Sequence, residues 1–70
     1  MKGDKRVGYR IKEAREAKNM SQEELAERAD ISRTIIWNLE TNPHAETTTK
    51  TLKKIAEALG TTVSAIFFED

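Results

Sequence analysis

The sequence predicts an all-α domain of five short helices with no sheet. Apolar residues recur three and four positions apart along most of the 70-residue chain, as they do on the buried face of a helix. Several segments open on Ser or Thr and close on Asn, Asp or Gly, which are typical of helix beginnings and ends. The densest β-branched cluster, residues 31–36, is interrupted by Ser32 and Arg33, so no strand is expected there.

The first helix is expected at about residues 5–18. Asp4 is placed to cap its beginning, and Asn19 is placed to end it in the left-handed conformation. The residues at helical spacing are Val7, Ile11, Ala14 and Lys18.

The second helix opens on a capping box at residues 21–24, Ser-Gln-Glu-Glu. In this motif the Ser21 hydroxyl accepts from the Glu24 backbone N–H, and the Glu24 side chain accepts from the Ser21 N–H. The residues expected on its buried face are Leu25, Ala26 and Ala29. We expect this helix to stop at Asp30.

The third helix begins two residues later, where Ser32 is placed to cap it. Ile36 and Leu39 lie three apart on its buried face, and Ile31 is expected to enter the core between the two helices. Two short helices joined across residues 29–32 form a helix-turn-helix, which we place at about residues 21–41.

The remaining elements are a loop and two helices. Residues 41–47 have turn chemistry without periodicity and are interpreted as a surface loop. Thr48 caps a fourth helix that Gly60 ends; its buried positions are Leu52, Ile55, Ala56 and Leu59. Thr62 caps a final short turn, whose apolar residues are Val63, Ile66 and Phe67.

Length and charge set broad limits on the domain. The 70 residues predict one small domain, residues 1–70, with its core at about 5–67 and no separate effector domain. Twelve basic residues cancel twelve acidic ones; residues 1–18 have net charge +4, residues 19–46 have −4 and the remainder have zero. The overall basic excess that is typical of a nucleic-acid binder is therefore missing.

The residue types present exclude several kinds of site. The chain has no Cys, and His44 is its only His, so thiolate zinc sites and a nucleophile–base pair lack the residues to form them. We expect no metal, no cofactor and no enzymatic activity. No apolar run approaches the roughly 18 residues of a membrane span, and the N-terminus lacks the apolar segment of a signal peptide. A cytoplasmic protein without membrane contact is expected.

Taken in order, these motifs resemble the phage lambda-repressor-like family, the Cro and repressor type of helix-turn-helix domain, over residues 11–67. The matching segments are Ile-Lys-Glu-Ala-Arg at 11–15, Met-Ser-Gln-Glu-Glu-Leu-Ala at 20–26, Ile-Ser-Arg-Thr at 31–34 with Ile36, Leu39 and Glu40, and residues 52–60. The resemblance implies a sequence-specific DNA-binding module of a transcriptional regulator, usually dimeric, whose third helix enters the major groove. Asp30 stands where the family often has Gly, and Trp37 stands where a small or polar residue is common.

The resemblance also implies which residues contact DNA. Arg33 has the fork geometry to pair with guanine, Asn38 has the amide to pair with adenine, and a methyl group of Ile35 or Thr34 could contact thymine. Gln22, the first residue of the second helix, stands at a natural phosphate site. The predicted DNA-binding residues are Gln22, Ser32, Arg33, Thr34, Trp37, Asn38 and Lys50. The alternatives are an ordinary solvated face for the third helix and a simple helix-start role for Gln22.

Two further pairs of residues are given other roles. Arg15 and Glu40 stand where the family has an Arg and a Glu that pair across the domain, so the resemblance implies a structural ion pair that does not contact DNA. Phe67 and Phe68 are predicted to form a dimer interface, because one short final turn directs only one side inward. The alternative is that both rings fold back onto the domain.

Together these expectations predict a transcriptional repressor that binds double-stranded DNA as a homodimer on a partly palindromic operator. It is expected to act by steric occupation of the promoter. The alternative is a protein-interaction module, such as an antitoxin or an antagonist that uses this fold to bind a partner protein. The neutral net charge and the expected exposure of Ile35 and Trp37 favour that alternative.

Overall fold

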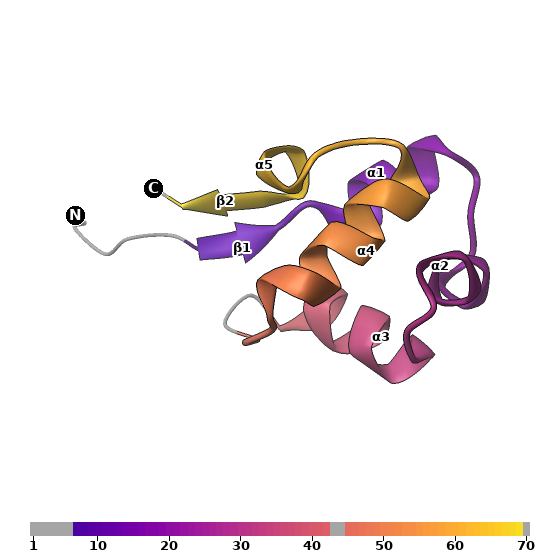
Figure 1. Ribbon diagram of the computed structural model, residues 1–70, viewed down its shortest axis with the longest axis horizontal. Coiled ribbons are helices and arrows are strands. Elements are labelled where there is room, and N and C mark those ends of the chain that lie inside the picture. The colour runs from indigo at the N-terminus through magenta and orange to yellow at the C-terminus, as the bar shows by residue number, and fades with distance from the viewer. Residues whose placement is uncertain (1–6, 43–44, 70) are drawn as a thin grey trace.

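The computed structural model describes residues 7–42 and 45–69, which form five helices and a short two-stranded ribbon (Figure 1). In chain order the elements are β1 (Val7–Tyr9), α1 (Ile11–Ala17), α2 (Gln22–Ala29), α3 (Arg33–Thr41), α4 (Thr49–Leu59), α5 (Val63–Ile66) and β2 (Phe67–Glu69). The five helices, with a helix-turn-helix at α2 and α3, confirm the predicted fold class.

The ribbon joins the two ends of the described chain, and here the expectation of no sheet is wrong. The strands are antiparallel, and their register pairs Val7 with Glu69, Gly8 with Phe68 and Tyr9 with Phe67. Valine and aromatic residues fit a pleated strand, whereas Gly8 would weaken a helix interior. The first helix therefore begins at Ile11 rather than near residue 5. The expected cap, Asp4, lies outside the described residues.

The helix-turn-helix has the boundaries that its capping residues predict. At the start of α2, Ser21 Oγ accepts from the Glu24 N–H at 3.0 Å, and at the start of α3, Ser32 Oγ accepts from the Ile35 N–H at 3.2 Å. Between the helices Asp30 has a φ of 59°, a left-handed conformation that Asp adopts more readily than most residues with a side chain. The turn thus forms without the glycine that the family often has there.

The capping box of α2 is only half formed. Glu24 Oε2 accepts from Nη2 of Arg28, one turn further along the helix, at 2.9 Å. Opposite charges four residues apart on a helix attract one another, and this pair engages the carboxylate that was expected to return to the Ser21 N–H. An ion pair along the helix therefore replaces the second bond of the capping box.

The fourth helix has both of its predicted ends. Thr48 Oγ1 accepts from the Thr51 N–H at 3.1 Å, and Gly60 ends α4 with a φ of 71°. The fifth helix is shorter than expected, since it stops at Ile66 and Phe67 enters β2. A backbone bond from the Arg10 N–H to the Ile66 carbonyl, 2.7 Å long, fastens the end of α5 to the start of α1.

Each helix contributes at least one fully buried side chain to a single core. These residues are Ile11, Leu25, Ile36, Ile55, Leu59 and Ile66. Burial of one such side chain stabilises the fold by about 1.5–3 kcal/mol, so the core fixes how α3 lies against α1 and α2. Ile31, between α2 and α3, is half-buried and packs against this core, as expected.

Candidate nucleic-acid interface

α3 has one buried face and one exposed face. Ile36 and Leu39 lie in the core, at 0% and 3% exposed. The residues exposed along the rest of the helix include Arg33, Thr34, Trp37, Asn38 and Thr41. The residues predicted to read bases therefore share a solvent-facing side. A helix anchored by its core face is free to enter a DNA groove with the other.

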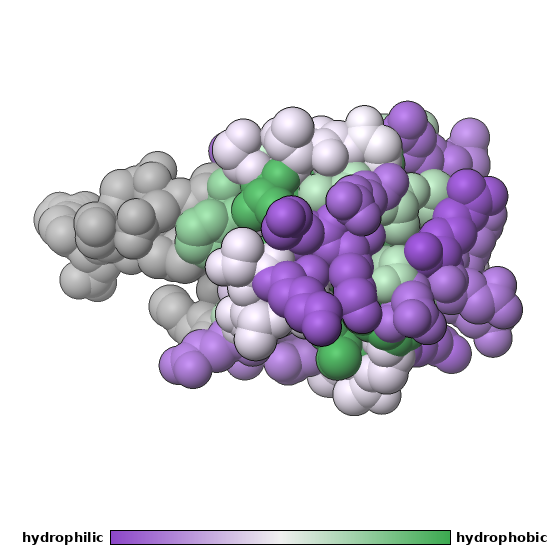
Figure 2. Space-filling model, viewed as in Figure 1, coloured by the Kyte–Doolittle hydropathy of each residue, from purple (hydrophilic) through white to green (hydrophobic). Residues whose placement is uncertain are grey.

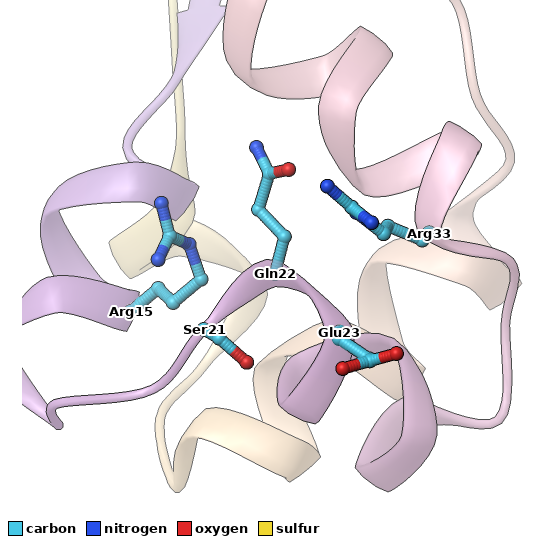
Figure 3. A pocket seen from close by; sticks show the side chains of 5 residues that line it. All are labelled: Arg15, Ser21, Gln22, Glu23 and Arg33. Carbon is cyan, nitrogen blue, oxygen red and sulfur yellow. The ribbon is translucent and has the colours of Figure 1, made fainter.

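Arg33 belongs to two shallow hollows at the start of α3. One, of about 260 Å³, is lined by Arg33, Thr34 and Trp37. The other, of about 300 Å³, is lined by Arg15, Ser21, Gln22, Glu23 and Arg33. Figure 3 shows the side chain of Arg33 extending from α3 toward the amide of Gln22, which stands at the start of α2. The structure thus brings Gln22, Arg33, Thr34 and Trp37 onto one continuous surface.

The guanidinium of Arg33 has no internal partner within the described part of the chain. Arg15 pairs with Glu40, and Arg28 pairs with Glu24, whereas no described residue forms a hydrogen bond or ion pair with Arg33. An unpaired guanidinium keeps its full fork of donors for an external ligand that offers two acceptors, such as a guanine edge or a phosphate.

Behind this surface, Arg15 and Glu40 form a bidentate ion pair between α1 and α3. Arg15 Nε lies 2.8 Å from Glu40 Oε2, and Nη2 lies 3.1 Å from Oε1. The two side chains are 11% and 2% exposed. The hydrogen bond to Glu40 raises the pKa of the Arg15 guanidinium above its usual value. Arg15 Nη1 also donates to the Met20 carbonyl at 2.7 Å, so the pair anchors the segment that leads into α2.

Gln22 is tied to this ion pair, which sequence reasoning did not anticipate. Its Nε2 donates to Glu40 Oε1 at 3.0 Å. Because a carboxylate only accepts, the amide must turn its NH₂ group toward Glu40, and its oxygen then lies on the side of Arg33 (Figure 3). A polar residue directly after an N-cap is too common a pattern to predict such a long-range bond.

The other predicted DNA-binding residues occupy the rim of this surface or lie apart from it. Ser32 is exposed, and its hydroxyl is already engaged as the N-cap of α3. Lys50 is exposed in the first turn of α4 and does not line either hollow. His44 lies outside the described residues.

The predicted dimer residues lie in β2, away from α3. Phe67 is half-buried, and its ring centroid lies 5.5 Å from that of Tyr9 at a tilt of 46°. One face of the Phe67 ring is therefore occupied within the domain. The side chain of Phe68 lies outside the described part of the structure.

Tyr9 also ties the ribbon to the segment that follows α3. Its hydroxyl donates to the Ala45 carbonyl at 2.7 Å, across 36 positions of sequence, and Ala45 is itself buried at 8% exposed. Burial, followed by the nearby carboxylate of Glu46, raises the pKa of the Tyr9 phenol. Sequence reasoning assigned residues 41–47 to a surface loop and missed this anchor, because neither residue belongs to a periodic pattern.

One face of the molecule, shown in Figure 2, has many hydrophilic residues, with hydrophobic areas at its lower edge, over α3, and in its upper left part. The large hydrophobic side chains exposed among the described residues are Ile35 at 38% and Trp37 at 54%, both on α3. None of the described helices is long and apolar enough to cross a membrane.

Comparisons with known proteins agree with this arrangement. A family model described as Helix-turn-helix matches residues 11–66. The immunity repressor protein of Bacillus phage phi105 is 39% identical over 64 residues, which are 91% of this chain and 44% of that protein, so the chain spans less than half of its relative. A chain in the structure of a SinR protein/SinI protein complex matches with a TM-score of 0.74 at 30% identity, over 80% of this chain and 54% of that chain. The chain therefore belongs to the lambda-repressor-like helix-turn-helix family.

Proposed function

We propose that the chain is the DNA-binding part of a cytoplasmic transcriptional repressor, that residues 1–70 act as one domain, and that two copies bind a partly palindromic operator. The observation that carries this proposal is the guanidinium of Arg33, which has no partner among the described residues and lies on the exposed face of α3, beside Thr34 and Trp37. A relative is named an immunity repressor protein, which favours repression over activation. Occupation of promoter DNA is sufficient for this role.

Base reading is assigned to the exposed face of α3. Arg33 pairs with the O6 and N7 acceptors of a guanine, and Asn38, just over one turn further along, pairs with an adenine. Each good bidentate pair discriminates against a wrong base by about 1–3 kcal/mol. The opposite face of α3 is held by the core, so the two side chains enter the groove together.

Phosphate contacts are assigned to helix beginnings. Gln22 is the first residue of α2, where unpaired N–H groups and the helix dipole favour an anion. Ser32 and Lys50 are exposed near the starts of α3 and α4. Such contacts position the protein on the duplex without reading sequence, and they set the salt dependence of its affinity.

Self-association is assigned to the C-terminal strand, with Phe67 and Phe68 at the contact. Both strands of a two-stranded ribbon are edge strands with unpaired backbone groups, which can pair with another chain. A two-fold contact uses the same surface on both copies. A repressor dimer of this type places its two reading helices roughly 34 Å apart, which is one turn of the duplex.

Selection of binding sites from a pool of random duplexes tests the proposed function. We expect enrichment of two related half-sites, with affinity that falls as salt rises because phosphate contacts release counterions. A pool that stays random after several rounds at low salt would contradict DNA reading by this chain.

A second candidate function is the binding of a partner protein through α3. Two large apolar side chains, Ile35 and Trp37, are exposed on that helix, and the net charge of the chain is zero. The matched chain of known structure belongs to a SinR protein/SinI protein complex. A gel-shift titration with the selected duplex at low salt separates the two functions, because a module that binds only protein gives no saturable band.

A further inference from the structure

The hollow lined by Arg33, Thr34 and Trp37 combines two kinds of surface. The indole of Trp37, in a residue that is 54% exposed, presents a broad apolar ring. The guanidinium of Arg33 beside it presents a fork of donors without an internal partner among the described residues. In the major groove, the thymine C5-methyl group is apolar and the guanine edge carries two acceptors. The two surfaces of the hollow match these two groups.

The spacing of Arg33 and Trp37 allows both to act on neighbouring base pairs. Four residues of helix span about 6 Å, and successive bases of one strand lie about 3.4 Å apart along the duplex axis. The two side chains therefore reach bases no more than two steps apart. The hollow, of about 260 Å³ and lined by Arg33, Thr34 and Trp37, lies on the exposed face of α3, where the edge of a base in the groove can reach it.

Ile35 is less well placed for the same contact. It is 38% exposed and does not line the hollow that contains Arg33. Two residues along a helix correspond to a rotation of about 200°, so Ile35 and Trp37 face different directions. The sequence assigned a contact with the thymine methyl group to Ile35 or Thr34. The indole of Trp37, with Thr34 beside it, is better placed to make this contact.

We propose that Trp37 is a specificity-determining residue, which covers the C5-methyl group of a thymine next to the guanine read by Arg33. This inference rests on the proposed function and names a base that α3 prefers. The recognised group is the methyl itself, not a hydrogen-bonding atom. Thymine is the source of this group in ordinary DNA, and 5-methylcytosine carries the same group.

Substitution of uracil for thymine tests the proposal, because it removes the methyl group and leaves base pairing unchanged. Each thymine of a selected duplex is replaced in turn, and binding is measured by titration. We expect wild-type protein to lose about fourfold in affinity at one thymine per half-site, the effect of burying one carbon less. Trp37→Ala should bind the thymine and uracil duplexes equally, and Trp37→Phe should retain part of the difference.

Ile35→Ala is the matched control, since it shortens the other exposed apolar side chain of α3. It should keep the full difference between thymine and uracil. At the sensitive position, 5-methylcytosine should bind more tightly than cytosine. Thermal melting of each variant checks that it folds. Because Trp37 is largely exposed, its replacement should change the melting temperature little.

Three results would overturn the proposal while leaving DNA binding intact. These are no uracil effect in the wild type, an equal effect in Trp37→Ala, and no gain from 5-methylcytosine over cytosine. If the wild-type protein selects no sequence at all, the proposed function itself fails, and the proposal fails with it.

Discussion

Gln22 and Glu40 are joined by a 3.0 Å hydrogen bond from Nε2 to Oε1, although they lie 18 residues apart in the sequence. The same carboxylate oxygen accepts from Arg15 Nη2 at 3.1 Å. Gln22 also lines the exposed hollow that contains Arg33. A buried ion pair thus fixes the orientation of a side chain on the surface assigned to DNA.

Loss of either partner of the ion pair should destabilise the domain. Arg15→Met leaves the carboxylate of Glu40, 2% exposed, with Gln22 as its remaining partner, and should lower the free energy of unfolding by about 3 kcal/mol. Glu40→Met should cost less, because the Arg15 side chain is 11% exposed and can reach water. For a small domain such losses unfold a large fraction of molecules.

Urea unfolding of the two single variants and the double variant measures the coupling. The double variant should be more stable than the sum of the single effects predicts, because neither charge is left without its partner. Strictly additive losses would contradict a direct interaction. DNA preference should be unchanged in any of the three variants that folds.

Gln22→Ala should weaken binding to every duplex to a similar extent, because it removes the second amide N–H of Gln22, the donor that the bond to Glu40 leaves for a phosphate. A phosphate contact carries no sequence information, so the selected consensus should remain the same while affinity falls severalfold. Glu23→Gln is a useful counterpart, since it removes a negative charge from the same hollow and should increase affinity at low salt. Gln22→Ala with wild-type affinity would contradict the phosphate role.

Tyr9→Phe should remove the anchor between β1 and the segment after α3. Loss of its hydrogen bond to the Ala45 carbonyl should cost about 1 kcal/mol in the free energy of unfolding. The folded state raises the pKa of Tyr9 above the reference value of 10.0. The neutral phenol therefore makes its full contribution to the free energy of unfolding below pH 10. This contribution is lost as pH rises through the folded-state pKa of Tyr9. Above pH 10 the stability advantage of wild type over Tyr9→Phe should shrink, and a constant advantage would contradict this.

Local signals in the sequence were sufficient to predict the helix-turn-helix. Ser21 and Ser32 are N-caps, whose partners lie three residues away, and Asp30 and Gly60 adopt the left-handed ends that their residue types favour. Each of these features depends on a few neighbouring residues. The family resemblance added the pairing of Arg15 with Glu40, which no local pattern encodes.

The features that sequence reasoning missed depend on contacts between distant segments. β1 pairs with β2 across the whole domain, and neither three-residue strand has enough alternation to be recognised. The Tyr9 bond to Ala45 and the Gln22 bond to Glu40 likewise join residues that only the folded core brings together. The exposed site on α3 was predicted as a set of residues, but the hollow beside Trp37 arises from side-chain packing.

Phe68→Ser should weaken self-association through the C-terminal strand. Sedimentation at micromolar concentration should show a dimer for the wild type and a smaller species for the variant, because an apolar contact has been replaced by a polar one. Phe67→Ser is expected also to destabilise the domain, since Phe67 packs on Tyr9. Identical monomers for wild type and Phe68→Ser would remove the dimer interface from this segment.

The most direct measurement of base reading by α3 is the consensus selected by Arg33→Ala beside that of the wild type. We expect the preference at one guanine per half-site to disappear, with a loss of about 1–3 kcal/mol on the wild-type site. Lys50→Ala should weaken all sequences alike, and Arg28→Ala, which removes an arginine already paired with Glu24, should leave the consensus unchanged. If Arg33→Ala selects the wild-type consensus with wild-type affinity, α3 does not read DNA through this residue.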